Sequence, residues 1–174
     1  MNVKQLKDIL CEALGTARRV AILGCGSVLL GDDAAGMYIA EKLLNAPHLP
    51  NIGENVRVYC GSTAPENFSG EIKRFKPDLL LVIDAADMAL KPGEVSLIPL
   101  SKITGVSFST HMLPLRIMLD YIVSETSCSI SILGIQSKSL AFSAKMSPAV
   151  RASADKLVAV LKDILALKEL KAAK

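Results

Sequence analysis

The sequence predicts an α/β fold in three layers, with a mostly parallel, twisted sheet of about five strands and helices on both faces. Strand-like and helix-like segments alternate along the chain, an order typical of parallel sheets. One strand, Leu79–Ile83, is apolar at every position, as expected in the middle of a sheet that is covered on both sides. The length of 174 residues and the hydrophobic content of 51% suit a single domain, 1–174, with a sizeable core.

The first third of the chain is expected to form a helix, a strand and a second helix. The first helix starts at Asn2, a suitable cap, and its apolar residues recur at the spacing of one helical face. Gly15 marks its end, and Val20–Leu23 is a short apolar strand. A glycine-rich turn, Gly24–Ser27, then leads to a helix that runs from about Asp33 to Asn45.

The rest of the chain continues the alternation. Glu94–Leu100 alternates between polar and apolar residues, which indicates a peripheral strand. The long C-terminal helix has one apolar face and is expected to pack on the sheet. The remaining expected elements are strands at Val56–Cys60, Leu79–Ile83 and Ser129–Ile135, and helices at Pro65–Phe75, Pro114–Val123 and from Ser147 onward.

Charge and aromatic content argue against nucleic-acid binding. The formal net charge is only +3, and a basic C-terminal stretch of this kind is typical of a solvated helix face. The chain has no Trp, three Tyr and four Phe, which leaves little material for stacking bases. No uninterrupted apolar run approaches the ~20 residues that a membrane span needs, so we expect no membrane insertion.

Cysteine usage indicates a reducing compartment. The four cysteines are widely spaced and form no C-x-x-C pair, which excludes a zinc ribbon and a thioredoxin-type redox site. Arg18 and Arg19 precede an apolar stretch and imitate a twin-arginine signal. That stretch is broken by glycines and ends on two aspartates rather than a cleavage site. We therefore expect a cytoplasmic protein with free thiols.

Acidic residues and a histidine converge on one edge of the predicted sheet. In open α/β sheets, ligands bind outside the carboxyl ends of the strands. Asp32 and Asp33 follow the first strand, and Asp84 directly follows Leu79–Ile83. His111 stands just before a helix. Asp33, Asp84 and His111 make a three-ligand set for a divalent ion, and their spacing does not choose between zinc, iron, nickel and manganese.

Each of these residues also has a purely structural interpretation. Asp33 is a favoured type of helix cap, and Asp84 can end its strand by accepting hydrogen bonds from loop amides. His111 suits a helix cap or a buried structural position. His48 lies in a proline-rich stretch and is typical of an exposed loop residue.

Other chemistries fit the sequence poorly. Gly24-x-Gly26 opens a dinucleotide fingerprint, but Leu29 stands where the third glycine belongs. The two aspartates that follow would repel a pyrophosphate from the helix N-terminus. Cys60 ends an apolar strand, which is a poor place to lower the pKa of a nucleophilic thiol.

Five short motifs occur in order between about positions 19 and 165. They are Gly24-Cys25-Gly26-Ser27-x-Leu29-x-Gly31-Asp32-Asp33-x-x-Gly36, Gly61-Ser62-Thr63-Ala64-Pro65-Glu66-Asn67, Val82-Ile83-Asp84-Ala85-Ala86-Asp87-Met88 with Pro92-Gly93-Glu94, Ser109-Thr110-His111-Met112-Leu113-Pro114-Leu115, and Leu133-Gly134-Ile135-Gln136. Together they resemble the hydrogenase maturation proteases, and the second motif resembles the hydrogenase-3 type that serves formate hydrogenlyase. The resemblance omits residues 1–18, which it marks as an N-terminal helical extension.

The resemblance implies an endopeptidase that trims the C-terminal tail from the large-subunit precursor of a nickel–iron hydrogenase. It implies that nickel is carried by the substrate and that the protease brings no resident metal. The metal-contacting positions of the family fall on Asp33, Asp84 and His111. Ser27 stands where the family commonly has Asn, although both residue types can hydrogen-bond the backbone of a turn.

The implied mechanism is proofreading by nickel, since an empty precursor supplies no ion to offset the repulsion between Asp33 and Asp84. Hydrolysis also needs an activated water. A metal can lower the pKa of that water, or a carboxylate can take its proton, as in an aspartic-type endopeptidase. Asp32 and Asp33 are the candidates for this catalytic carboxylate.

Two other functions remain open from the sequence. A non-enzymatic nickel-binding or nickel-insertion factor would use the same ligands without hydrolysis. A general peptidase would cut unrelated unfolded proteins. The sequence has no conspicuous apolar stripe beyond those that form the core, so a monomer is the default expectation.

Overall fold

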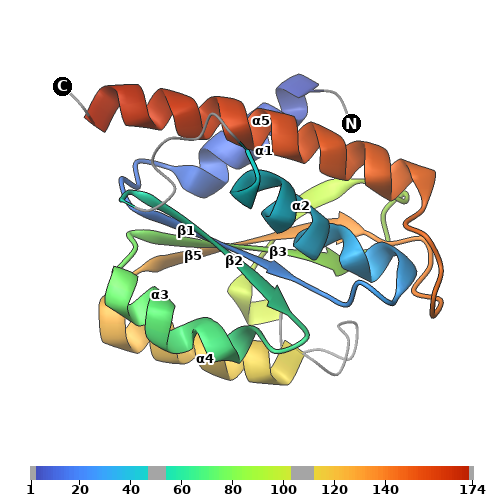
Figure 1. Ribbon diagram of the computed structural model, residues 1–174, viewed down its shortest axis with the longest axis horizontal. Helices are drawn as coiled ribbons and strands as arrows, with labels where there is room; N and C mark the ends of the chain where they lie inside the picture. The colour runs from blue at the N-terminus through green and yellow to red at the C-terminus, as the bar shows by residue number, and fades with distance from the viewer. Residues whose placement is uncertain (1–2, 47–53, 103–111, 173–174) are drawn as a thin grey trace.

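The computed structural model describes residues 3–46, 54–102 and 112–172, and it confirms the three-layer α/β fold (Figure 1). The five-stranded sheet has the order β2-β1-β3-β5-β4. Four strands are parallel, and β4 is antiparallel to β5 at one edge, which confirms the peripheral position expected for that segment. The strands are β1 (Val20–Cys25), β2 (Val56–Ser62), β3 (Leu79–Ala86), β4 (Val95–Ile98) and β5 (Ser129–Gln136).

Five α-helices cover the two faces of this sheet. One face carries α1 (Val3–Leu14), α2 (Ala35–Leu44) and α5 (Pro148–Ala172), and the opposite face carries α3 (Ser69–Phe75) and α4 (Met112–Thr126) (Figure 1). Two expected helices begin differently from the prediction, since short 3-10 turns at Gly31–Ala34 and Pro65–Phe68 precede α2 and α3. A third such turn spans Leu100–Lys102. Within the described ranges, no helix is long and apolar enough to cross a bilayer.

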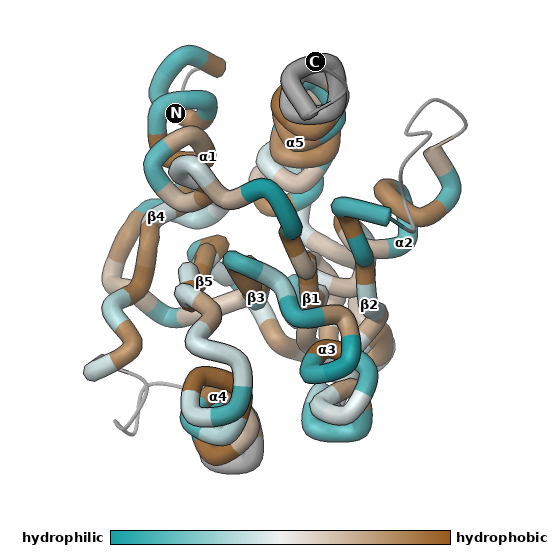
Figure 2. The backbone as a smooth tube through the Cα atoms, turned by 90° about the vertical axis from the view of Figure 1, so that its left-hand side faces the viewer, coloured by the Kyte–Doolittle hydropathy of each residue, from teal (hydrophilic) through white to brown (hydrophobic). Residues whose placement is uncertain are grey.

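The central strand β3 supplies buried side chains to both layers. Leu79, Leu81 and Ile83 pack toward α1, α2 and α5, whereas Leu80 and Val82 pack toward α3 and α4. This alternation follows from the two-residue period of a strand, and it explains why an uninterrupted apolar run belongs at the centre of the sheet. Figure 2 shows the strands in their order across the molecule, with helices above and below them.

The N-terminal helix α1 is part of the main core. Leu6, Leu10 and Leu14 are buried against neighbours that include α5. The hydroxyl of Ser131 on β5 donates a 3.0 Å hydrogen bond to the carbonyl oxygen of Ala13. The segment that the sequence motifs omit therefore contributes to the packing of the sheet.

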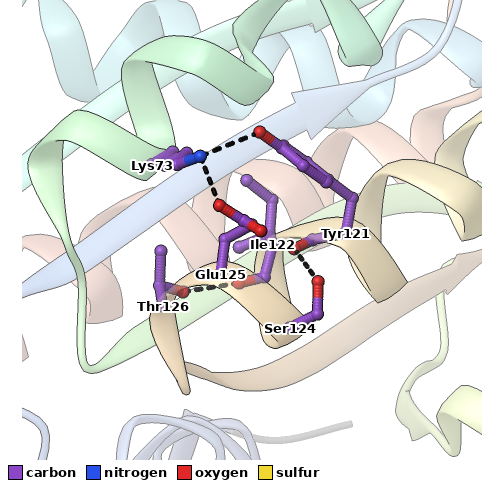
Figure 3. Close-up of polar contacts among 6 residues, drawn as sticks. All are labelled: Lys73, Tyr121, Ile122, Ser124, Glu125 and Thr126. Atoms are coloured by element: carbon purple, nitrogen blue, oxygen red, sulfur yellow. Dashed lines mark hydrogen bonds and ion pairs between the residues drawn. The ribbon is translucent and has the colours of Figure 1, made fainter.

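On the other face, a polar bridge joins α3 to α4 (Figure 3). Lys73 forms an ion pair with Glu125 and donates a 3.1 Å hydrogen bond to the hydroxyl of Tyr121. Below it, the hydroxyl of Thr126 donates to the carbonyl oxygen of Ile122 at 2.6 Å and closes the last turn of α4. The two contacts of Lys73 hold the two helices of the smaller layer together.

Candidate active site

The candidate site lies at the edge where the parallel strands end. Gly24 of β1 pairs with Ile83 of β3, so the next residues are Cys25, which ends β1, and Asp84. The strand β3 continues to Ala86, three residues beyond the predicted end, so the alternative in which Asp84 ends its strand is wrong. Asp84 in turn pairs with Gly134 of β5. Asp84 thus lies toward the carboxyl ends of the parallel strands, where ligands bind in open α/β sheets.

Glycines bring the start of α2 against this edge. A Cβ atom on Gly36 would clash with the carbonyl oxygens of Ile83 and Cys25, and one on Gly24 would clash with the carbonyl of Gly36. The backbones of α2, β1 and β3 therefore touch without intervening side chains. This close approach places Asp33, which precedes α2, beside the ends of β1 and β3.

Asp33 is held by the turn that follows β1. Its Oδ2 accepts a 2.7 Å hydrogen bond from the backbone N–H of Ser27, and only 6% of the residue is exposed. Gly26 has a φ of +108° and leaves no room for a Cβ against the Asp33 backbone. Ala34, not Asp33, occupies the N-cap of α2, so the alternative in which Asp33 caps that helix is wrong.

Asp84 is a second buried carboxyl group at the same edge. It is 6% exposed, and its Oδ1 accepts a 2.8 Å hydrogen bond from the backbone N–H of Ala85. Burial, with the negative charge of Asp33 as a second cause, raises the pKa of Asp84 to about 8. Two carboxyl groups that repel each other in this way form a site that favours a proton or a cation between them.

The thiol of Cys25 shares this environment. It is 3% exposed, and burial raises its pKa well above the ordinary value, with further contributions from the charges of Asp84, Asp33 and Glu66. The thiol is therefore held neutral beside the acidic pair. Cys60 also has a raised pKa, caused first by burial and then by Glu41, in agreement with its exclusion as a nucleophile.

Asp32 does not point at the acidic pair but fastens two loops together. We call residues 26–34 the β1 loop and residues 137–147 the β5 loop. Oδ2 of Asp32 accepts hydrogen bonds from the N–H groups of Lys138 (2.7 Å) and Ser139 (3.0 Å) and from the hydroxyl of Ser147 (3.0 Å). Oδ1 accepts a 2.6 Å bond from the Ser147 N–H.

These four bonds determine the ionisation of Asp32. Its exposed fraction is 0%, and burial alone would raise the pKa, but the four donors outweigh burial and lower it below the ordinary value. A carboxylate whose two oxygens are already occupied by four donors is a weak proton acceptor. Its position is that of a buried anchor between two loops.

Gln136, at the end of β5, organises the loop after β3 in a similar way. Its Oε1 accepts hydrogen bonds from the N–H groups of Met88 (2.7 Å) and Leu90 (3.1 Å), and its Nε2 donates to Asp87 (3.2 Å). Sequence reasoning assigned no role to Gln136 or to Ser147. The signals that could have identified Gln136 are its place in the fifth motif and its polar side chain at the end of an apolar strand.

The structure thus brings together two of the three expected metal ligands, Asp33 and Asp84. The third, His111, lies outside the described residues, as does His48. Within the described ranges, no group of three or more His, Cys, Asp or Glu side chains is arranged to hold a metal ion. Ser27 makes the backbone contact expected of its motif position, because its hydroxyl accepts a 3.3 Å hydrogen bond from the Leu29 N–H.

Comparison with known proteins agrees with the motifs. A family model described as hydrogenase maturation protease matches residues 37–164. A Methanocaldococcus jannaschii relative that also carries the name of this family is 38% identical over 173 residues, which cover 97% of this chain and 100% of the relative. The hydrogenase 3 maturation protease of Escherichia coli K12 is 36% identical over 116 residues, covering 66% of this chain and 70% of that protein.

The fold has a close counterpart among solved structures. The crystal structure of HycI, a nickel–iron hydrogenase maturation protease from Thermococcus kodakarensis KOD1, superposes with a TM-score of 0.79. The two chains are 31% identical, and the match covers 90% of this chain and 98% of that one.

Proposed function

Because the chain belongs to the hydrogenase maturation protease family, we propose that it removes the C-terminal tail from the nickel-loaded large-subunit precursor of a nickel–iron hydrogenase. Endopeptidase activity on such a precursor follows from the family. The finer proposal is that Asp33, Asp84 and His111 read the nickel in the substrate.

The observation that carries this proposal is the buried acidic pair. Asp33, just before α2, and Asp84, in β3, lie at the same edge of the sheet. The negative charge of Asp33 contributes to the raised pKa of Asp84. A divalent cation brought by the substrate would replace the proton and relieve this repulsion. Nickel accepts oxygen and imidazole ligands, so the proposed set suits it.

The same pair supplies the proofreading. A precursor without nickel would meet the two neighbouring carboxyl groups and would bring no cation to offset the repulsion between them. A loaded precursor would gain two carboxylate contacts to its metal. The protease thereby favours the finished substrate through a difference in binding between the two precursors.

We assign the proton-accepting role to Asp33 rather than to Asp32. Within the described residues, Asp33 accepts a single hydrogen bond, on Oδ2, and its Oδ1 is available to a water molecule. Asp32 is saturated by four donors and is assigned a positioning role. The attacking water would pass its proton to Asp33 while its oxygen bonds to the scissile carbonyl carbon. Asp33 would then give this proton to the amide nitrogen, and the C–N bond would break to release the tail as a free amine.

We further propose that the reaction takes place in the cytoplasm, with the protease as a monomer and with no resident cofactor. The four cysteines are free thiols, a state typical of a reducing compartment.

The test is to incubate the protein with its cognate precursor, nickel-loaded or nickel-free, and to follow the loss of the tail by intact mass spectrometry. We expect a single cut in the loaded sample only. Asp33→Asn, Asp84→Asn and His111→Gln should each slow the cut about 100-fold or more. Asp120→Asn, which removes an exposed carboxylate paired with Arg116, is the control and should cut at the wild-type rate.

The outcomes separate the alternatives. Equal cleavage of both precursors would refute proofreading but keep the protease. Binding of the loaded precursor without any cut would support a nickel-binding factor instead. Digestion of unfolded casein would indicate a general peptidase.

A further inference from the structure

Four large apolar side chains are exposed on the β1 loop and the β5 loop. We call them the apolar rim. Their exposed fractions are 58% for Val28, 54% for Leu29, 47% for Leu140 and 73% for Phe142. Apolar side chains gathered on neighbouring loops usually mark an interaction surface, and aromatic residues are enriched in such surfaces.

The two loops adjoin each other and form one surface. The N–H of Ser143 donates a 2.8 Å hydrogen bond to the carbonyl oxygen of Leu29, and the N–H of Asp32 donates a 3.0 Å bond to that of Ser139. The Asp32 carboxylate adds the four bonds described above. The right-hand side of Figure 1 shows the β5 loop, in orange, beside the start of α2.

This surface is continuous with the acidic pair. The β1 loop leaves β1 at Gly26, carries Val28 and Leu29 at its tip, and returns to Asp33. Two backbone hydrogen bonds, from Leu30 to Ser27 and from Asp33 to Leu30, keep it tightly turned. Val28 and Leu29 therefore lie in the same tight loop as Asp33, so a polypeptide bound at the acidic pair is near the rim.

The charge beside the rim is positive. Lys138 and Lys145 are exposed on the β5 loop, and that loop contains no acidic residue. The acidic residues of the β1 loop, Asp32 and Asp33, are buried. The surface therefore suits a segment that is apolar and carries negative charge, as the α-carboxylate at the end of a C-terminal tail does.

We propose that the apolar rim docks the C-terminal segment of the large-subunit precursor, next to the bond that is cut. Apolar residues of that segment pack against Val28, Leu29, Leu140 and Phe142, and its acidic groups face Lys138 and Lys145. The identity of this partner rests on the proposed function. The rim contributes affinity for the substrate, while the acidic pair distinguishes loaded from empty precursor.

The experiment compares Phe142→Ser and Leu140→Ser with a matched control, Leu44→Ser. The exposed fraction of Leu44 is 42%, similar to that of Leu140. Leu44 lies at the end of α2 that is farther from the site. For each protein, KM and kcat are measured with nickel-loaded precursor, and Kd is measured with nickel-free precursor by isothermal titration calorimetry. A thermal unfolding curve verifies that each variant is folded. If Phe142→Ser does not fold, the measurements on Leu140→Ser decide the test.

We expect KM and Kd to rise about tenfold or more in both rim variants. At saturation kcat should stay within twofold, and Leu44→Ser should match the wild type in every measurement. Cleavage with an unchanged KM and Kd in both rim variants would overturn the docking surface while keeping the proposed function. The docking surface would also be overturned if the rim substitutions changed only the mass of the free protein in analytical ultracentrifugation. In that case the occupant of the rim would be a second copy of the chain.

The two proposals fail separately. If the wild type does not cut the loaded precursor but binds the empty one with a rim-dependent Kd, the proposed function is wrong and the docking surface stands. If the wild type neither cuts nor binds, both are wrong.

Discussion

The anchoring role of Asp32 is tested by Asp32→Asn. The substitution keeps the shape of the side chain but removes its charge and turns one acceptor into a donor. With the amide nitrogen at the Oδ1 position, the partly buried N–H of Ser147 loses its partner, which costs about 1–3 kcal/mol. The three bonds to Oδ2 become neutral rather than charge-assisted, which costs about 1 kcal/mol each. The expected loss of stability is therefore about 4–6 kcal/mol.

The assay is urea unfolding at pH 7 and at lower pH. Because the pKa of Asp32 is lower in the folded protein than its ordinary value of 3.8, the stability from its charge is fully present above about pH 4. It is lost as the pH falls through the folded-state pKa, where wild-type Asp32 also becomes neutral. The difference in the free energy of unfolding between the wild type and Asp32→Asn should thus be large at pH 7 and small below pH 4.

Ser147→Ala provides a graded control. It removes one of the four donors and should cost about 1–2 kcal/mol. An Asp32→Asn protein with the wild-type urea midpoint at pH 7 would refute the anchoring role. If that stable protein also had no cleavage activity, Asp32 would return as the candidate proton acceptor.

Three further substitutions test other parts of the structure. Asp84→Asn should be more stable than the wild type at pH 9, measured by thermal unfolding, because the wild-type carboxyl must ionise above its pKa of about 8 in a buried site; equal stability there would contradict the raised pKa. Leu10→Ala should lower the free energy of unfolding, measured in urea, by about 2–5 kcal/mol, whereas Lys7→Ala at an exposed position should change it by less than about 0.5 kcal/mol. A Leu10→Ala protein as stable as the wild type would show that α1 is a dispensable extension. Gly36→Ala should destabilise by about 1–3 kcal/mol or more and reduce cleavage, because its Cβ meets the strand backbones. Gly70→Ala in α3 should stabilise by about 0.5–1 kcal/mol, because its Cβ meets only the Arg74 side chain, at an ordinary contact distance of 3.7 Å.

Much of the architecture could be predicted because local patterns determine it. The run Leu79–Ile83 is apolar at every position, so both of its faces must be covered, and only a central strand is covered on both faces by helices. The glycines around the first strand end predicted a tight turn, and Asp33 and Asp84 were expected at one edge because parallel strands end together. The structure brings both aspartates to that edge.

The role of Asp32 was beyond the reach of local patterns. Its partners lie 106–115 residues away in the sequence, so nothing near Asp32 distinguishes an anchor from a catalytic carboxylate. The apolar rim was missed for a related reason. Two residues from one loop and two from another form no periodic stripe. They become one surface only where backbone hydrogen bonds and the Asp32 carboxylate join the loops.

The long separation between Asp32 and Ser147 also sets an order of events during synthesis. A ribosome adds about 5–20 residues per second, so roughly ten seconds pass between the appearance of Asp32 and that of Ser147. In the later part of this interval, after Asp84 has been added, the nascent chain carries both Asp33 and Asp84 but still lacks Ser147, which anchors the neighbouring loop. The bonds that join the β1 loop to the β5 loop can therefore form only after synthesis has passed Ser147, later than the appearance of both acidic residues.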